Sequence, residues 1–336
     1  MAHDGSVWAA GSNDFGQLGT SSKTNPATTF VQVFSGSVNA VAAGDEHSML
    51  LRQDGSVWST GRSVHGQLGD GSKNIGREHF AKVISGGAKA IAAGSKHSLV
   101  LKEDGSIWAS GYNRHGELGD ESVDNRRTFV RVFIDGMEAV AVGADHSLVL
   151  GGDGNVWGTG GNYYGQIADP YLPSTPSFLL VTTGAEAIAA GGYHSMVVKR
   201  HGRLWVMGAN SYGQLGDGSE KTSRGIREVR IESCNAKAVA AGVYHSMVLG
   251  RDGTVWAAGQ NDHGQLGDGS KTSKSVFVRV ISGVQAVAAG GWHSMVLRRD
   301  GSFWVTGKNH EGQLGDGSTI DKSAFVRVAK ASDSGV

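Results

Sequence analysis

An adjacent histidine and serine recur along the chain, and an imidazole beside a hydroxyl could activate a serine nucleophile. Each pair lies in a short apolar run. Adjacent side chains of a strand point to opposite faces, so the histidine cannot act as a base on its neighbour. No acidic residue accompanies every pair as the orienting group of a triad. We therefore predict no catalytic residue, and interpret six histidines as structural groups that hydrogen-bond backbone between units: His47, His97, His146, His194, His245 and His293.

Metal and phosphate chemistry find no sequence support. Zinc needs three or four ligands close to one point, whereas equivalent histidines of successive units should be spread around a ring. The sequence has no His-Glu-x-x-His motif and a single cysteine, Cys234. Glycine- and aspartate-rich segments such as NDHGQLGDGS lack the phosphate-loop lysine and the register of a calcium loop. We predict turns there, no metal site and no cofactor.

The histidine-serine pairs belong to a longer repeat. One tryptophan per unit follows a turn segment, at Trp8, Trp58, Trp108, Trp157, Trp205, Trp256 and Trp304, so the period is about 50 residues. Periods of this size are typical of propellers and solenoids.

Each unit contains four short apolar runs, which in the last complete unit are 286–290, 293–297, 302–307 and 325–328. Their length and their content of Val, Phe, Trp and Thr favour strands. Asp-Gly between the second and third runs predicts a two-residue hairpin. The first run consists of small residues, which suits a narrow axis, so we expect the four strands to follow one another from axis to rim.

Four hairpin-linked strands form one propeller blade, and the sequence predicts an all-β, seven-bladed β-propeller of four-stranded antiparallel blades. The third and fourth runs occur seven times, but the first and second occur only six times. We therefore expect one incomplete blade, the alternative being a chain cut from a longer one. The expected propeller domain covers residues 1–328, with a C-terminal tail at 329–336.

Two elements resemble the regulator of chromosome condensation repeat family. The first is seen in VAAGDEHSMLL, IAAGSKHSLVL and VAAGGWHSMVL. The second, Gly-x-Asn-x-x-Gly-x-Leu-Gly, is matched at 11–19, 111–119, 208–216, 259–267 and 307–315. The resemblance covers nearly the whole chain and implies a seven-bladed β-propeller. Unit 2 departs from it at Arg62-Ser63, and unit 4 has QIADPYLPSTPS in place of QLGDGS.

The resemblance implies function less closely than fold, because propellers host many activities. Relatives include an exchange factor for the small GTPase Ran, a β-lactamase inhibitor, a plant UV-B photoreceptor and modules of ubiquitin ligases. They share a rigid disc that binds another protein. We therefore expect a protein partner, such as a small GTPase or an enzyme to be inhibited. The photoreceptor's tryptophan cluster is not reproduced, since only Trp292 occupies its position.

Composition restricts the partner further. Lys+Arg and Asp+Glu both number 31, so no positive excess favours nucleic acid or an anionic membrane. A single cysteine excludes an intrachain disulfide framework and suits a reducing compartment. No signal-peptide core and no run of 18 apolar residues occurs. We expect a soluble monomer in the cytoplasm or nucleus that contacts neither nucleic acid nor membrane directly.

The variable face of the disc is the expected binding surface. Because strand direction alternates, the loop before the motif histidine and the loop carrying GQLG share one face, and the nearly invariant Asp-Gly turns occupy the other. Variable loops are where recognition usually resides. Late units carry aromatic residues at the variable positions, and such residues anchor interfaces. The predicted partner-binding residues are Tyr193, Tyr212, Tyr244, His263 and Trp292. The alternative is that these rings pack across the loop bases.

Early units carry charges at the same positions, namely Glu46, Lys96 and Asp145. These predict, as a second hypothesis, an enzyme or small-ligand binder with a polar site at the mouth of the axial channel. A third hypothesis is guanine nucleotide exchange on a Ran-like GTPase. The only inserted loop that could serve as a wedge is the proline-rich segment 169–177, for which we expect a rigid, extended conformation.

Overall fold

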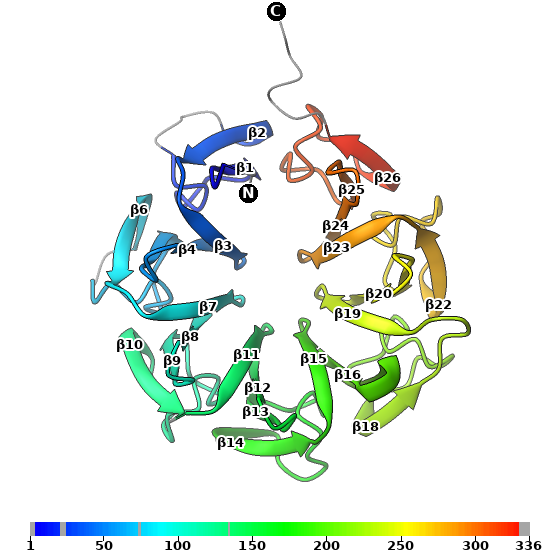
Figure 1. Ribbon diagram of the computed structural model, residues 1–336, viewed down its shortest axis with the longest axis horizontal. Coiled ribbons are helices and arrows are strands. Elements are labelled where there is room, and N and C mark those ends of the chain that lie inside the picture. Colours follow the sequence, from blue (N-terminus) through cyan, green and yellow to red (C-terminus); the bar gives the residue numbers. More distant parts are fainter. Residues whose placement is uncertain (1–3, 21–24, 73–74, 134, 329–336) are drawn as a thin grey trace, which may run out of the picture.

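The computed structural model describes residues 4–20, 25–72, 75–133 and 135–328. In this part of the chain six four-stranded antiparallel sheets and one two-stranded sheet stand around a central axis (Figure 1). Each four-stranded sheet keeps its strands in chain order from axis to rim, which confirms the predicted radial order. The predicted tail at 329–336 lies outside the described residues.

The two inner strands of each complete blade carry the small-residue run and the His-Ser run. The innermost strands are β3 (Val38–Ala43), β7 (Ala88–Ala93), β11 (Met137–Val142), β15 (Ala185–Ala190), β19 (Ala236–Ala241) and β23 (Val284–Ala289). The second strands are β4 (His47–Arg52), β8 (His97–Lys102), β12 (His146–Gly151), β16 (His194–Lys199), β20 (His245–Gly250) and β24 (His293–Arg298).

The two outer strands carry the tryptophan run and the final apolar run. The third strands are β1 (Val7–Gly11), β5 (Val57–Arg62), β9 (Ile107–Gly111), β13 (Val156–Gly161), β17 (Arg203–Gly208), β21 (Val255–Gly259) and β25 (Phe303–Gly307). The rim strands are β2 (Ala27–Phe34), β6 (Gly76–Ile84), β10 (Arg126–Phe133), β14 (Ser174–Thr182), β18 (Ser223–Val229), β22 (Lys274–Ile281) and β26 (Lys322–Val328). A single 3-10 turn, η1, spans Arg200–Gly202.

The seventh blade is incomplete, as the count of runs predicts, and consists of β1 and β2. Its rim strand nevertheless joins the last blade. Thr29 forms a β-bridge with Asp316, and the N–H of Gly317 donates to the carbonyl of Thr28 at 2.9 Å. The ends of the described chain therefore meet at one junction of the ring (Figure 1).

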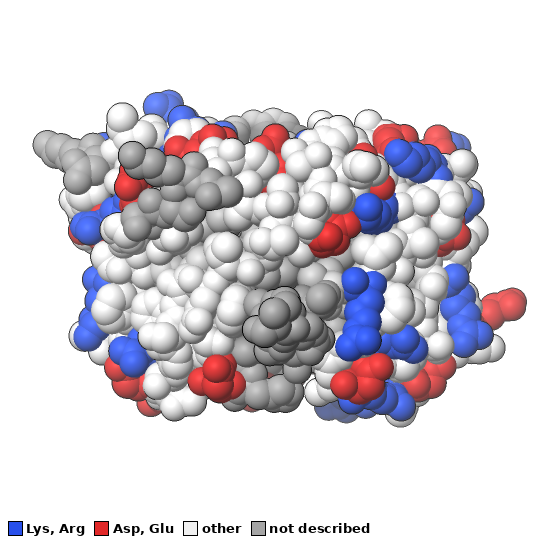
Figure 2. Space-filling model, turned by 90° about the horizontal axis from the view of Figure 1, so that it is seen from above, with Lys and Arg blue, Asp and Glu red and all other residues white. Residues whose placement is uncertain are grey.

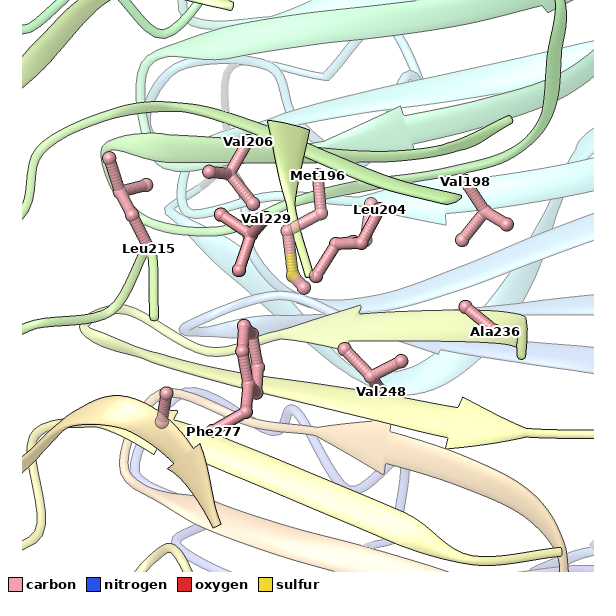
Figure 3. Close-up of a cluster of buried hydrophobic side chains, with 11 residues drawn as sticks. Met196, Val198, Leu204, Val206, Leu215, Val229, Ala236, Val248 and Phe277 are labelled. Atoms are coloured by element: carbon pink, nitrogen blue, oxygen red, sulfur yellow. The ribbon is translucent and has the colours of Figure 1, made fainter. Parts of the chain in front are cut away.

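The core lies between blades rather than within them. In the cluster of Figure 3, Met196, Leu204 and Val206 of one blade are fully or nearly buried against Val248 and Phe277 of the next. Each blade therefore buries its apolar faces against its neighbours, as expected for a radial array of sheets.

One repeated contact fixes the spacing between blades. A glycine closing the GQLG segment receives a phenylalanine from the rim strand of the next blade. A Cβ on Gly119 (φ 73°) would lie only 2.3 Å from the Phe178 ring. In unit 4 both partners change together, since Ala168 replaces the glycine and Ile226 the phenylalanine, and both pack on one core cluster. The smaller rim residue leaves room for the added methyl group.

The Asp-Gly turns are longer than predicted. The N–H of Arg52 donates to the carbonyl of Ser56 at 2.9 Å, so three residues, 53–55, form the loop instead of two. Gly55 has a φ of 73°, and its N–H donates to the carbonyl of Arg52 at 3.0 Å. This is a three-residue hairpin closed by a left-handed glycine. A Cβ there would lie 2.7 Å from the amide nitrogen of Gly87.

The proline-rich segment is also less loop-like than predicted. Strand β14 begins at Ser174 and includes Pro176, so only the first part of 169–177 is a loop. A rim strand has one unpaired edge and therefore tolerates a residue without an N–H. Asp169 holds the loop by accepting the N–H groups of Tyr171 and Leu172, both at 2.8 Å.

Candidate functional site

The His-Ser motif contributes to blade-to-blade contacts. His97 Nε2 lies 2.9 Å from Ser147 Oγ of the next blade, and the same bond joins four other pairs of neighbouring blades. The sequence analysis expected backbone partners. A serine hydroxyl takes that place because the second strands of adjacent blades bring successive motifs together. His97 is fully buried, and burial lowers its pKa to about 3, so the imidazole is neutral.

His293, the sixth histidine, has a different setting. It lies in the last blade, and no hydrogen bond from its ring is found in the described part of the chain. Its side chain is partly exposed, and burial lowers its pKa to about 4. The incomplete blade beyond it provides no second strand, so the series of His-Ser bonds ends here.

The two variable loops of each unit are joined on one face. The backbone N–H of Ala209, the residue after β17, donates to the carbonyl of Tyr193 at 2.8 Å. The backbone N–H of Gln260 donates to the carbonyl of Tyr244 at 2.9 Å. Equivalent bonds link Lys308 to Trp292 at 2.8 Å. The residues before the motif histidines therefore lie beside the GxN loops, as strand alternation predicts.

Four tyrosines from three units form a continuous group, which we call the tyrosine cluster: Tyr164, Tyr193, Tyr212 and Tyr244. Tyr193 lies between Tyr164 and Tyr244, with ring centroids 5.5 and 5.9 Å away. Tyr244 also contacts Tyr212 at 5.1 Å. Tyr164 and Tyr212 are 44% and 37% exposed, whereas Tyr193 and Tyr244 are half-buried, and burial raises the pKa of both. The cluster is thus partly packed and partly presented to solvent.

The other two predicted aromatic positions have neighbours of their own. Trp292 is 39% exposed and its ring carries the Lys308 ammonium 5.0 Å from the centroid. His263 contacts His310 and hydrogen-bonds to Asp321, with Nδ1 2.8 Å from Oδ2. Within the described ranges, neither ring contacts the tyrosine cluster.

A second row of rings continues the tyrosine cluster into earlier units. His65 contacts Tyr112 at 5.0 Å, Tyr112 contacts His115 at 6.2 Å, and His115 contacts Tyr163 at 5.6 Å. This row was not predicted from the sequence, because Tyr112 and Tyr163 stand at positions of the GxN loop other than the variable position before the GQLG glycine. A comparison of every GxNxxG position would have found them.

The three charged residues predicted at the channel mouth do not form a common group. Glu46 accepts two hydrogen bonds from Arg62, both at 2.9 Å, and the Lys96 ammonium lies 5.7 Å from the centroid of Tyr112. Burial raises the pKa of the Asp145 carboxyl. Among the described residues, no hydrogen bond or ion pair connects the three side chains.

Two open hollows lie on the opposite face. One of about 540 Å³ is lined by Val33, Phe34 and Arg52, and one of about 330 Å³ by Asp252, Trp256 and Arg279. Both adjoin Asp-Gly turns rather than the tyrosine cluster. Neither of these two hollows is lined by a residue of the tyrosine cluster.

On the side of the disc shown in Figure 2, acidic and basic side chains lie interspersed, and basic side chains also occupy mid-height toward the right. In the described part of the chain, no helix has the length and apolar character needed to cross a membrane.

This ring of radial, four-stranded antiparallel blades defines a seven-bladed β-propeller with one incomplete blade. A family model described as the RCC1-like domain matches residues 1–220. Models of the regulator of chromosome condensation (RCC1) repeat match 201–249 and 252–297, and also 236–265 and 284–313. The chain belongs to the RCC1 repeat family. Among curated proteins, none matches the sequence.

Solved structures share the fold at low sequence identity. Prp20p of Saccharomyces cerevisiae, described with its binding to Gsp1p and histones, is 20% identical at a TM-score of 0.87, over 99% of this chain and 88% of that one. Yeast RCC1 (Prp20) bound to Kap60 is 19% identical at 0.87, over 97% and 84%. Human WBSCR16 is 21% identical at 0.83, over 97% and 93%. These similarities establish the fold.

Proposed function

We propose that this propeller is a protein-binding module that recognises its partner through the variable loop face, with the tyrosine cluster as the central contact. The observation that carries the proposal is the contact of four tyrosine rings from three consecutive units on that face. Tyrosine supplies a large apolar surface together with a hydroxyl, and is enriched at the energetic centres of interfaces.

The rigidity of the platform supports this role. The backbone carbonyls of Tyr193 and Tyr244 accept hydrogen bonds from the GxN loops, and their half-buried rings contact neighbouring rings, so both main chain and side chains are ordered before binding. Pre-ordered side chains lower the entropic cost of association. We place the interaction in the cytoplasm or nucleus and expect the propeller to act as a monomer.

The test replaces the ring groups and leaves the opposite face intact. Tyr193, Tyr212 and Tyr244 are changed together to alanine, and Gln53→Ala with Glu103→Ala on the exposed Asp-Gly face serves as the matched control. Proteins that co-purify with the wild-type chain are identified, and the affinity of the purified pair is measured by calorimetry. One lost anchor costs about 2 kcal/mol or more, so the triple variant should bind at least about 30-fold more weakly. Equal affinity of a folded triple variant would contradict the proposal.

A second candidate is guanine nucleotide exchange on a Ran-like small GTPase. Membership of the RCC1 repeat family and the similarity to Prp20p, described as binding Gsp1p, favour it. The assay is release of a fluorescent nucleotide from such a GTPase at catalytic amounts of propeller. If the propeller binds the GTPase but the nucleotide leaves at its intrinsic rate, the propeller recognises the GTPase without catalysing exchange.

A further inference from the structure

Two histidines and one aspartate converge at the junction of the last two blades. His263 follows β21, while His310 and Asp321 lie between β25 and β26. His263 Nδ1 is 2.8 Å from Asp321 Oδ2, and His310 Nε2 is 3.4 Å from Asp321 Oδ1. One ligand atom from each of the three side chains lies within 4.8 Å of the others. The two imidazole planes are perpendicular, with centroids 5.7 Å apart.

One oxygen of Asp321 has a structural role that recurs in other units, and this role does not involve its second oxygen. Its Oδ1 accepts the N–H of Asn309 at 2.8 Å. Equivalent positions are Asn125, whose Oδ1 accepts from Asn113 at 2.9 Å, and Ser273, which accepts from Asn261 at 3.3 Å. A neutral residue thus suffices to hold the loop. Asp321 adds a negative charge and a second oxygen, which is directed at His263.

The combination of the two histidines is specific to this junction. The position of His310 is occupied by Arg114, Tyr163 and Ser211 in other units. The position of His263 is also histidine at His65 and His115, but those two face Arg114 and Tyr163 in the next unit instead of a second histidine. Two imidazoles and a carboxylate coincide only here among the described junctions. Asp321 is also well held, because its side chain is only 9% exposed while it contacts both rings.

We propose that His263, His310 and Asp321 form a site for a divalent transition metal ion, with zinc as the best match. Imidazole nitrogen and carboxylate oxygen are zinc ligands, and three protein ligands leave a fourth tetrahedral position for water. Tetrahedral bonds of about 2 Å place ligand atoms about 3.3 Å apart, so the 2.8 Å between His263 Nδ1 and Asp321 Oδ2 must lengthen by about half an ångström, and any ligand pair farther apart, up to the 4.8 Å that spans the group, must approach. His310 is exposed and gives solvent access to the site.

Binding would fasten two blades on the variable face. His263 belongs to one blade and the other two ligands to the next, so the ion would add a link between loops that are already joined by the bond of His263 to Asp321 and by the backbone bridge of Asp268 to Ala324. When the ion binds at Nδ1 of His263, the proton between Nδ1 and Asp321 must leave that nitrogen, either for solvent or for Nε2 of the same ring, since the ligand nitrogen must be deprotonated.

The test uses Co²⁺ as a spectroscopic probe and Zn²⁺ for calorimetry, with the full chain freed of metal by chelation. We expect one equivalent of Co²⁺ to produce the visible absorption of a tetrahedral site, and one equivalent of Zn²⁺ to displace it and raise the unfolding temperature. Asp321→Asn keeps the loop-holding oxygen, as Asn125 shows, and removes the charge. This variant and His310→Ala should each bind at least about 10-fold more weakly. His79→Ala, an exposed histidine on the rim strand β6, should bind as the wild type does.

Absence of saturable binding at one equivalent would overturn the proposal. Binding that is equally strong in Asp321→Asn and His310→Ala, or lost in His79→Ala, would also overturn it, because the ion would then sit elsewhere. Unchanged circular dichroism and unchanged metal-free unfolding of Asp321→Asn show that its weaker binding does not come from misfolding.

Discussion

His47 Nε2 lies 2.8 Å from Ser98 Oγ in the next blade, and Ser98 Oγ donates its own proton to the carbonyl of Gln67 at 2.8 Å. A carbonyl can only accept, so the serine proton is committed and His47 must donate from Nε2. Its Nδ1 is left as an acceptor with no partner among the described residues. The imidazole therefore gives a proton to the serine rather than taking one, which is the reverse of nucleophile activation.

The first prediction concerns this bond. Ser98→Ala removes the acceptor of His47 and the donor to Gln67, and should lower the free energy of unfolding by about 1–3 kcal/mol because buried polar groups lose their partners. Urea unfolding measures the loss. Ser48→Ala is the matched control, since Ser48 donates to Gln17 at 2.7 Å but no described histidine donates to it. If both variants lost the same stability, the histidine bond would contribute nothing.

The second prediction is steep loss of stability in mild acid. Burial lowers the pKa of His47 to about 4 and of His97, His146, His194 and His245 to about 3. Unfolded histidine titrates near 6.5, so below that pH the unfolded chain binds protons that the folded chain does not. The stability contribution is complete above pH 6.5 and is lost as the pH falls toward 4.

The size of that effect can be stated. For each pH unit below 6.5, each such histidine lowers the free energy of unfolding by about 1.4 kcal/mol. Five of them lower it by about 7 kcal/mol per pH unit, which is comparable to the whole stability of a domain. We expect cooperative unfolding between pH 6 and 5. Urea unfolding midpoints, determined at a series of pH values, measure this loss of stability. His245→Gln should reduce the number of protons taken up on unfolding by one. A flat profile down to pH 5 would show that the imidazoles are not neutral and buried.

The third prediction tests the contact between GQLG and the rim strand. Gly119→Ala should cost about 2–4 kcal/mol, because the new methyl meets the Phe178 ring and the backbone is left-handed. Phe178→Ile in the same chain recreates the Ala168 and Ile226 combination of unit 4 and should recover about 1–2 kcal/mol relative to the sum of the single variants. A double-mutant cycle in urea measures this coupling, and additive losses would mean that the two side chains do not meet.

The fourth prediction concerns a missing hydrogen bond. In unit 3 the indole N–H of Trp108 donates to Ser106 at 3.1 Å, and Ser106 donates to Asp104 at 2.6 Å. In unit 5 the corresponding residues are His201 and Arg203, and the buried indole nitrogen of Trp205 has no hydrogen-bond partner in the described part of the chain.

Restoring that bond should stabilise the fold. His201→Asp with Arg203→Ser is expected to add about 0.5–1.5 kcal/mol. The unfolding midpoint measures the gain, and Arg203→Ala, which supplies no hydroxyl, is the control. A gain of the same size in Arg203→Ala would assign the effect to removal of the arginine.

Particular residues show what could and could not be predicted. The strand runs and the missing inner pair of one blade follow from alternation and turn residues, which act within a few positions of the chain. The serine partner of each histidine did not follow, because His47 and Ser98 are separated by 51 residues. The predicted length of the Asp-Gly turns was wrong, because a left-handed glycine closes both two-residue and three-residue hairpin loops.

The candidate binding surface was also predicted only in part. Comparison of units selected Tyr193, Tyr212 and Tyr244, and the structure adds Tyr164 and a second row of rings that begins at His65. It also turns His263 away from the tyrosines and toward Asp321.

The sequence by itself determined the repeat, its four strands, their order from axis to rim and the incomplete blade, because hydrophobic periodicity and turn chemistry are local. Only the tertiary structure decided which side chains of neighbouring blades meet. Those contacts join residues about one repeat apart, and their distances are set by the packing of one blade against the next, for which a single sequence carries no measure. His47 with Ser98, Gly119 with Phe178 and His263 with Asp321 are all contacts of this kind.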